Sequence, residues 1–106
     1  MSNLYENIGQ YLYVECIVQN EFSIEELAKA IRVSQDLLRK IIRGKRRLSV
    51  DVAKRIECAT KMSALVLLSL QSFYELSNLK GRRYSSIPEL THARLEVENL
   101  PDLNIS

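Results

Sequence analysis

The sequence has 106 residues, of which 46% are hydrophobic and 26% are charged, and its formal net charge is +2. This is the composition of one globular domain, and the length excludes a second domain with a large catalytic cleft. The longest apolar run, residues 64–68, is far shorter than the roughly 20 residues of a membrane-spanning helix. Since the N-terminal residues also lack a signal-peptide pattern, we expect a cytoplasmic protein that does not bind membranes.

The chain has two cysteines, Cys16 and Cys58, and a single histidine, His92. Their spacing fits neither a zinc site nor a disulfide framework, so we expect each cysteine to be a small core residue. Catalysis by general acids, bases or nucleophiles needs a cluster of such groups in a pocket, and His92 stands apart in the C-terminal tail. The sequence therefore predicts no metal, no cofactor and no enzymatic activity.

Apolar residues recur at helical spacing through most of the chain, and proline is absent before residue 88, which predicts an all-α fold. Five helices are expected, at residues 8–19, 24–31, 35–43, 50–59 and 64–79. Serine stands at the N-cap of the last four: Ser23, Ser34, Ser49 and Ser63. Ser23 and Glu26 form a capping box. Gly44 and Gly81 are expected to end the third and fifth helices.

The second and third of these helices have the spacing of a helix-turn-helix, in which a turn of about three residues joins two short helices. Ala28 is the small residue that lets them cross closely, and Val33 plugs the turn. Leu38 and Ile41 anchor the second helix to the core. The outward side chains are those that such a helix would place in the major groove of DNA: Ser34, Gln35, Asp36, Arg39, Lys40 and Arg43.

Positive charge is concentrated in the same part of the chain. Residues 32–55 carry nine Lys or Arg against two Asp, a net charge of +7, whereas residues 1–31 carry one Lys against five Glu, a net charge of −4. Lys and Arg that meet phosphates release counterions, which favours binding to a polyanion. The alternative is a helical hairpin with a solvated charged face, but such faces mix both signs. The sequence therefore predicts double-stranded DNA as a partner.

Individual roles follow from hydrogen-bonding chemistry. Gln35 is expected to bond the edge of adenine and Arg39 to read guanine. Asp36 is expected either to accept from cytosine or only to complement the helix dipole. The other members of the set are expected to hold phosphates: Ser34, Lys40, Arg43, Lys45, Arg46 and Arg47.

Three segments resemble the XRE-type helix-turn-helix domain: residues 23–34 (SIEELAKAIRVS), 42–49 (IRGKRRLS) and 53–56 (AKRI). Residues 68–76 (LSLQSFYEL) resemble the L-N-L-Q-x-x-Y-D-L segment of HigA/VapI-type antitoxins. The resemblance covers about residues 8–77 and implies a five-helix, lambda-repressor-like domain at residues 8–79. It also implies an antitoxin of a type II toxin-antitoxin module, which neutralises a RelE-like HigB ribonuclease toxin and represses its own operon as a dimer.

The chain departs from the family pattern at several positions. Arg32 stands in the turn where the family usually has Gly. Because Gly tolerates a positive φ, Arg32 implies either strain or a modified turn. Val50 replaces a common Pro and Lys61 a common Gly. None of these positions is a predicted DNA contact, and the operator sequence does not follow from relatives.

The predicted fifth helix carries more apolar surface than a core this small needs. Five of its residues recur at helical spacing and are expected to form the interface of a two-fold homodimer: Val66, Leu67, Leu70, Phe73 and Tyr74. The alternative is that they only close the core of a single chain. A dimer would place two recognition helices about one DNA turn (~34 Å) apart and would require a palindromic operator.

Helical periodicity ends in the C-terminal tail, residues 80–106. A turn at Ser85-Ser86 and an alternating run at residues 93–98 predict an extended segment with one short strand. Such a segment would either add to an exposed sheet edge of a toxin or form a loose terminus.

Two other classes of function fit the same domain. A stand-alone XRE-family repressor, of phage or chromosomal origin, binds DNA in the same way without a toxin partner. Such a repressor usually carries a further effector or oligomerisation domain, for which the 27 residues of the tail leave little room. A purely structural interaction module is the third class.

Overall fold

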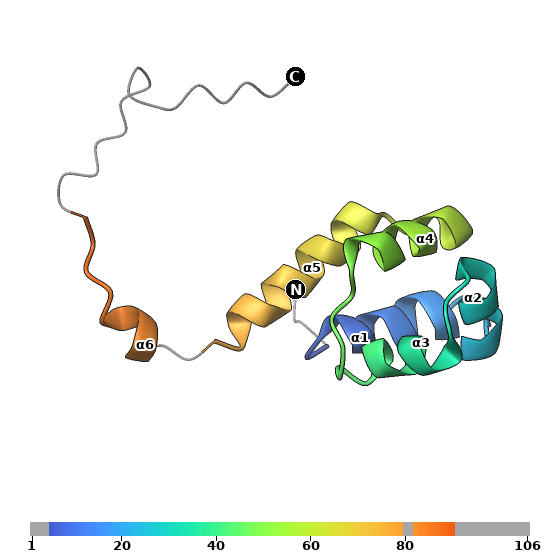
Figure 1. Cartoon of the computed structure of the whole chain (residues 1–106), viewed down its shortest axis with the longest axis horizontal. Coiled ribbons are helices and arrows are strands. Elements are labelled where there is room, and N and C mark those ends of the chain that lie inside the picture. The colour runs from blue at the N-terminus through green and yellow to red at the C-terminus, as the bar shows by residue number, and fades with distance from the viewer. Residues whose placement is uncertain (1–4, 80–81, 91–106) are drawn as a thin grey trace, which may run out of the picture.

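The computed structural model of the chain describes residues 5–79 and 82–90. Seven elements follow one another: α1 (Ile8–Tyr11), the π-helix η1 (Leu12–Val18), α2 (Ile24–Ile31), α3 (Gln35–Ile42), α4 (Val50–Thr60), α5 (Ala64–Ser77) and α6 (Arg82–Ser85). No strand occurs in the described residues, and the predicted all-α fold class is confirmed. Figure 1 shows α1 and η1 running on as one helix, which corresponds to the first predicted helix.

Serine side chains cap the N-termini of α2 to α5, as the sequence predicts. The Ser23 hydroxyl accepts the Glu26 N–H at 2.9 Å, and the Glu26 carboxylate accepts the Ser23 N–H at 2.9 Å, which completes the capping box. The other three capping hydroxyls each accept the N–H three residues ahead: those of Ser34, Ser49 and Ser63. Each cap satisfies a donor that the first turn of a helix leaves without a partner.

The turn between α2 and α3 is left-handed and strained. Arg32 has a φ of 62°, and the Val33 N–H donates to the Ala28 carbonyl at 3.0 Å, the bond that closes a helix C-terminus on a left-handed residue. The Arg55 guanidinium of α4 also donates to the Ile31 carbonyl at 3.0 Å. Of the two alternatives for Arg32, the structure thus selects strain, held in place by Arg55, a role that the sequence did not indicate.

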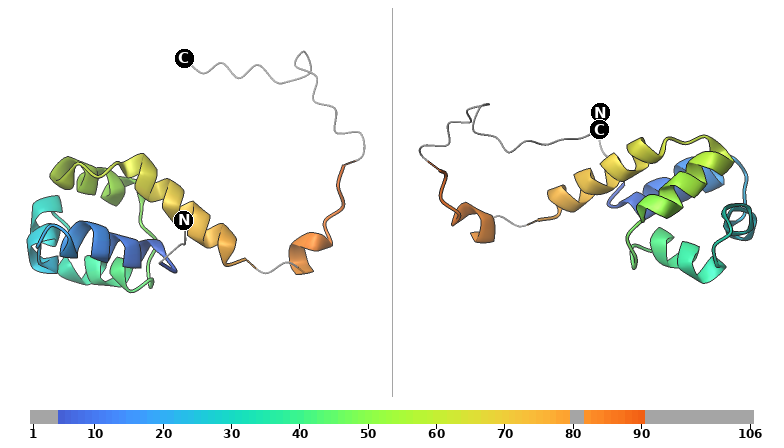
Figure 2. Two further views of the ribbon diagram at one scale, coloured as in Figure 1. Left: turned by 180° about the vertical axis from the view of Figure 1, so that it is seen from behind. Right: turned by 45° about the horizontal axis from the view of Figure 1, so that its top comes forward.

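The core lies between the helices of residues 8–77. α3 packs on α1 and α2, α4 packs on α2 and α5, and α5 packs on α1, an arrangement that Figures 1 and 2 show from three sides. The largest fully buried side chains come from η1, α3, α4, α5 and the loop before α4: Leu12, Cys16, Leu38, Ile41, Leu48, Ile56 and Leu67. Ala28 is also buried, as expected for the small residue at the crossing of α2 and α3.

Helix α1 touches the end of α3 at Gly9. A Cβ atom added there would collide with the carbonyl oxygens of Ile41 and Ile42. Only glycine permits this approach. The close contact sets α1 against the last turn of α3 and against the loop that follows it, and no motif in the sequence indicated this role of Gly9.

The first helix is wider than an α-helix over Leu12–Val18, which the helical periodicity had not indicated. The Gln19 N–H donates to the Val14 carbonyl at 3.0 Å, five residues back. The Asn20 side chain donates to the Cys16 carbonyl at 2.7 Å, a second contact made by the widened end of the helix. Cys16 is buried as predicted, and burial raises the pKa of its thiol. Cys58 is exposed, so the expectation that both cysteines are core residues is wrong for Cys58.

The described part of the tail differs from the expectation. Residues Arg82–Ser85 form the short helix α6, and the Ser86 hydroxyl donates to the Arg83 carbonyl at 3.0 Å. The predicted extended segment is therefore interrupted by a helical turn, since local hydrogen bonds are satisfied within it. Figures 1 and 2 show α6 standing away from the other helices. The predicted strand at residues 93–98 lies outside the described residues.

Candidate nucleic-acid interface

Helix α3 presents one face to the core and the opposite face to solvent. Leu38 and Ile41 are buried, while Leu37 and Gln35 are half-buried at the edges. The remaining predicted contacts of this helix and its flanks are all exposed: Ser34, Asp36, Arg39, Lys40 and Arg43. Placement of these side chains follows from the 3.6-residue period, because residues three and four apart share a face.

The exposed side chains of α3 are paired along the helix. The Arg39 guanidinium donates to the Gln35 side-chain oxygen at 2.9 Å, and the Lys40 ammonium lies 3.0 Å from the Asp36 carboxylate. Both pairs join residues four apart, and both are open to solvent, where such pairs contribute little stability. The first pair holds Gln35 and Arg39 side by side. Because both pairs are exposed, their side chains can leave these partners for others at low cost.

The loop between α3 and α4 carries three successive cations, Lys45, Arg46 and Arg47, and all three are exposed. We call residues 43–48 the basic loop. Gly44 enters it with a φ of 74°, the left-handed position predicted for it. The Lys45 N–H donates back to the Lys40 carbonyl at 2.8 Å, so the loop begins as a tight reversal from the end of α3.

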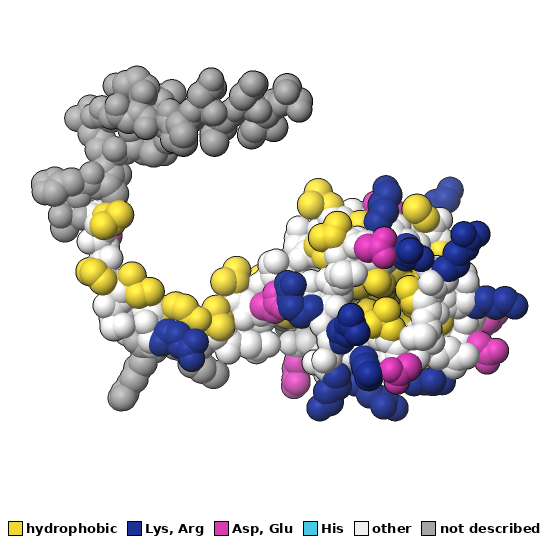
Figure 3. Space-filling model, viewed as in Figure 1, with side chains coloured by type: hydrophobic (Ala, Val, Ile, Leu, Met, Phe, Trp, Pro, Cys, Tyr) yellow, Lys and Arg dark blue, Asp and Glu magenta, His cyan; other side chains and the backbone are white. Residues whose placement is uncertain are grey.

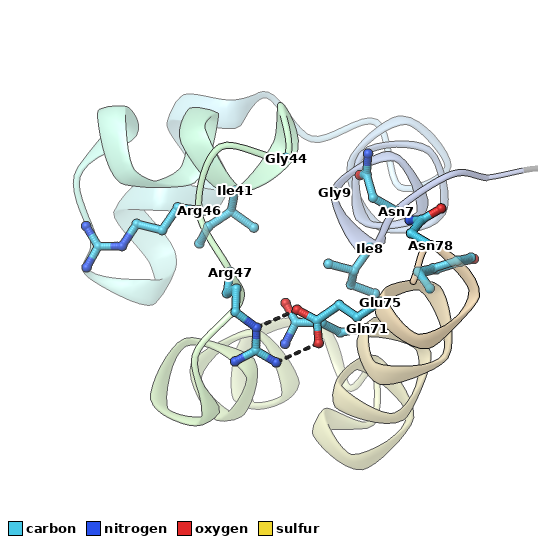
Figure 4. A pocket seen from close by; sticks show the side chains of 11 residues that line it. Asn7, Ile8, Gly9, Ile41, Gly44, Arg46, Arg47, Gln71, Glu75 and Asn78 are labelled. Carbon is cyan, nitrogen blue, oxygen red and sulfur yellow. Dashed lines mark hydrogen bonds and ion pairs between the residues drawn. The ribbon is translucent and has the colours of Figure 1, made fainter. Parts of the chain in front are cut away.

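Two of the loop cations, Arg46 and Arg47, point in different directions. Figure 4 shows Arg46 directed away from the cavity, of 140 Å³, that the loop and α5 enclose, and Arg47 directed across it toward Glu75. The Arg47 Nε–H and an Nη–H donate to the two Glu75 oxygens at 2.5 and 2.9 Å. This fork raises the pKa of Arg47 and lowers that of Glu75. Arg47, a predicted phosphate contact, is thus engaged by α5 in this structure.

A buried glutamine holds the same loop one helical turn away. Gln71 is 3% exposed, and its amide oxygen accepts the Leu48 N–H at 2.7 Å while its amide N–H donates to the Leu48 carbonyl at 2.9 Å. Sequence reasoning used Gln71 only as part of a family segment. A polar residue with buried apolar neighbours four back and three ahead, Leu67 and Tyr74, is the signal that could have identified it.

The cations surround the end of the domain that α3 and the basic loop form. In Figure 3, Lys and Arg side chains lie along the lower edge of the domain, where Figure 1 places α3, and also at its upper right, where it places α4. Acidic side chains on that edge are few in this view. A basic surface of this kind attracts a phosphate backbone independently of sequence, and Gln and Arg side chains carry groups that can pair with base edges.

The predicted dimer residues divide between the interior and the surface. Leu67 and Tyr74 are buried in the core of the chain itself, which leaves them no surface for a second chain. Leu70 is half-buried, whereas Val66 and Phe73 are about half exposed, at 49% and 52%. Further exposed apolar residues extend the outer face, namely Leu65, Leu76 and Leu79. Figure 3 shows such side chains continuing along the far end of α5.

Within residues 5–79 and 82–90, no group of three or more His, Cys, Asp or Glu side chains is placed to hold a metal ion. A helix long and apolar enough to cross a membrane is likewise not found in that part of the chain.

Comparisons with known proteins agree with this geometry. The helix-turn-helix family model matches residues 15–67, half of the chain. No protein with a curated function matches the sequence. Among solved structures, the Pseudomonas aeruginosa antitoxin HigA with the higBA promoter is 32% identical, with a TM-score of 0.63, over 67% of this chain and 77% of that one.

Two further solved structures are similar. A Pseudomonas aeruginosa protein in complex with its 18-base-pair operator DNA is 28% identical, with a TM-score of 0.71, over 79% of this chain and 95% of that one. A HigA-family addiction module antidote protein from Coxiella burnetii is 24% identical, with a TM-score of 0.61, over 66% of this chain and 76% of that one, and it shows a common fold. The comparisons identify a DNA-binding regulator and not an enzyme. The chain belongs to the XRE-type helix-turn-helix family, as a HigA-type member.

Proposed function

We propose that the chain is the DNA-binding antitoxin of a type II toxin-antitoxin module and represses its own operon as a homodimer. One observation carries the DNA-binding part. A serine-capped helix, held against α2 by a left-handed turn, presents Gln35, Arg39 and Arg43 on a single solvent face beside a loop of cations. Relatives solved with promoter or operator DNA support it.

In this proposal Gln35 and Arg39 read bases, because a side-chain amide pairs with adenine and a guanidinium with guanine in the major groove. Asp36 either accepts from cytosine or complements the helix dipole. Phosphate contacts fall to Ser34, Lys40, Arg43, Lys45 and Arg46, all exposed around the same end of the domain.

The homodimer is proposed through the outer face of α5, with Val66, Phe73 and Leu76 at its centre. These side chains are 49%, 52% and 69% exposed, more apolar surface than isolated exposed residues provide. A two-fold axis there would present two copies of α3 to successive major grooves of a palindromic site.

Substitution of Arg39 tests the reading of bases. The test duplex is the DNA segment upstream of the chain's own gene. Binding to it is compared with binding to a duplex of random sequence. Arg39→Ala should weaken binding to the upstream duplex by about 1–3 kcal/mol and change binding to random DNA little. Arg46→Ala should weaken both and flatten the salt dependence by about one unit. Equal losses on both duplexes from Arg39→Ala would exclude base reading by Arg39.

The antitoxin part rests on the HigA likeness and needs a separate experiment. A RelE-like HigB toxin, encoded beside this chain, should arrest growth when expressed alone and lose that effect when the chain is co-expressed. The alternative function, a stand-alone XRE-family repressor, is favoured if the neighbouring genes encode no such toxin and the chain still binds its upstream DNA.

A further inference from the structure

Helix α5 holds the basic loop at two adjacent points. Gln71 forms two hydrogen bonds to the backbone of Leu48, and Glu75, one turn further along α5, forms a two-bond fork with the Arg47 side chain. Figure 4 shows both side chains reaching from α5 toward the loop that runs beside them. We call these four hydrogen bonds the α5 clamp.

The inner half of the clamp, the two hydrogen bonds of Gln71, provides partners for buried backbone groups. Leu48 is 1% exposed and lies between two helices, outside the bounds of both, so its N–H and carbonyl need partners from elsewhere. A primary amide carries both a donor and an acceptor, and one Gln side chain therefore satisfies both groups of Leu48. Glu would supply the acceptor alone when ionised, and Leu would supply neither.

The outer half of the clamp, the two hydrogen bonds of Glu75, engages Arg47, which the sequence predicts to contact phosphate. The fork occupies two of the five Arg47 donors and neutralises its charge with Glu75. Lys45 and Arg46 are exposed and carry no such partner on α5. Because this fork is bidentate, it is harder to exchange than the single-contact pairs on α3, so Arg47 is less available for counterion release than Lys45 and Arg46.

We propose that Gln71 and Glu75 are positioning residues of the DNA interface, and that Arg47 is the anchor of the basic loop instead of a phosphate contact. The clamp sets the direction in which Lys45 and Arg46 leave the loop. Because it rests on α5, it also ties the loop to the helix that carries the proposed dimer face. The proposal rests on the proposed DNA binding and adds which residues shape its phosphate-binding loop.

The salt dependence of DNA binding separates an anchor from a phosphate contact. Binding of the full-length chain to a random-sequence duplex is measured over a range of salt concentrations. Arg46→Ala should reduce the slope of log K against log salt concentration by about one. Arg47→Ala combined with Glu75→Gln, which removes both charges of the fork, should lower the affinity several-fold at every salt concentration and leave the slope unchanged. A slope reduced equally by Arg46→Ala and by the double variant would overturn the assignment of Arg47.

The substitution Glu75→Gln releases Arg47 without removing it. If Glu75 withholds the cation from DNA, this variant should bind random DNA with a slope steeper by about one. Glu25→Gln is the matched control, since it removes one exposed acid on α2, away from the loop, and should leave the slope as it is. Equal slopes for Glu75→Gln and the unsubstituted chain contradict the outer half of the clamp.

Hydrogen exchange tests the inner half without DNA, so failure of the proposed function and failure of this proposal remain distinguishable. The Leu48 N–H should be protected in the unsubstituted chain. In Gln71→Glu it should remain partly protected through the retained acceptor, and in Gln71→Leu it should exchange at least as fast as exposed loop amides. If Gln71→Leu does not fold, Gln71→Glu decides, because its Leu48 N–H should exchange faster than that of the unsubstituted chain, and an equal rate would overturn the role of Gln71. Unchanged Leu48 protection in a folded Gln71→Leu would overturn the role of Gln71.

Discussion

The two faces of α5 have similar composition and opposite surroundings. On the inner face Leu67, Gln71 and Tyr74 are buried, while on the outer face Phe73 and Leu76 are exposed. A polar residue thus lies inside and an aromatic one outside. Hydrophobicity alone does not decide which face of a helix with apolar residues on both sides meets the core. The partners on each side decide it, since the Leu48 backbone needs an amide and the outer face meets no other element among residues 5–79 and 82–90.

The largest expected effect comes from the inner face. Leu67→Ala removes a fully buried side chain and should lower the free energy of unfolding by about 2–5 kcal/mol, through lost transfer energy and the cavity left behind. Urea denaturation at low protein concentration measures it. Leu76→Ala, at a position 69% exposed, should change the monomer's stability by less than about 0.5 kcal/mol. Similar losses in both variants would abolish the distinction between the two faces.

The outer face should control assembly and not folding. The double substitution Phe73→Glu with Leu76→Glu places charges on the proposed two-fold interface and should convert a dimer to a monomer in sedimentation experiments. Helical content by circular dichroism should be unchanged. Binding to a palindromic duplex should fall by about 100-fold or more, because the second recognition helix is no longer linked to the first. A dimer that persists in this variant would place the interface elsewhere.

The cap of α5 should affect both faces equally. The Ser63 hydroxyl accepts the Val66 N–H at 3.2 Å at the start of the helix, so Ser63→Ala should lower the free energy of unfolding by about 1 kcal/mol. Ser72→Ala, at an exposed position in the middle of α5, should cost nothing, because alanine is the better helix former. Thermal unfolding of the two variants side by side shows whether the effect belongs to the cap.

The smallest expected effect is a dependence of the α5 clamp on pH. The fork with Arg47 lowers the pKa of Glu75 below its usual value of 4.5. A group with a lowered folded-state pKa stabilises above its unfolded value and loses that contribution as the pH falls through the lowered one. The outer half of the clamp should therefore be complete at neutral pH and open in acid. Carboxyl titration by NMR measures this, and in Arg47→Ala the Glu75 pKa should return toward 4.5.

Features set by neighbours in sequence were predictable, and features set by distant partners were not. The serine caps and the left-handed Gly44 depend on groups within a few residues, and each was predicted. The role of Arg47 depends on Glu75, 28 residues away, and its charge alone suggested a phosphate contact. The Ile31 carbonyl, to which Arg55 donates, belongs to a different helix, 24 residues back.

The remaining misses have several origins. Periodicity identified the apolar residues of α5 but did not show that Leu67 and Tyr74 fill the chain's own core. The expectation that Cys58 is buried came from residue type alone, while its exposure follows from the face of α4 on which it lies. The π-helical widening depends on i to i+5 bonds that leave no mark on an apolar pattern.

The left-handed residues at the ends of α2 and α4 also matter for how such a protein evolves. Arg32 and Lys61 adopt φ values of 62° and 67°, at a cost of roughly 1–2 kcal/mol each for residues with a side chain. A single change to glycine at either position relieves that cost, partly offset by the greater entropy of the unfolded chain. Two substitutions to glycine would therefore raise the stability of the chain. Such a reserve would allow destabilising changes on the surface of α3, through which a new DNA sequence could be recognised.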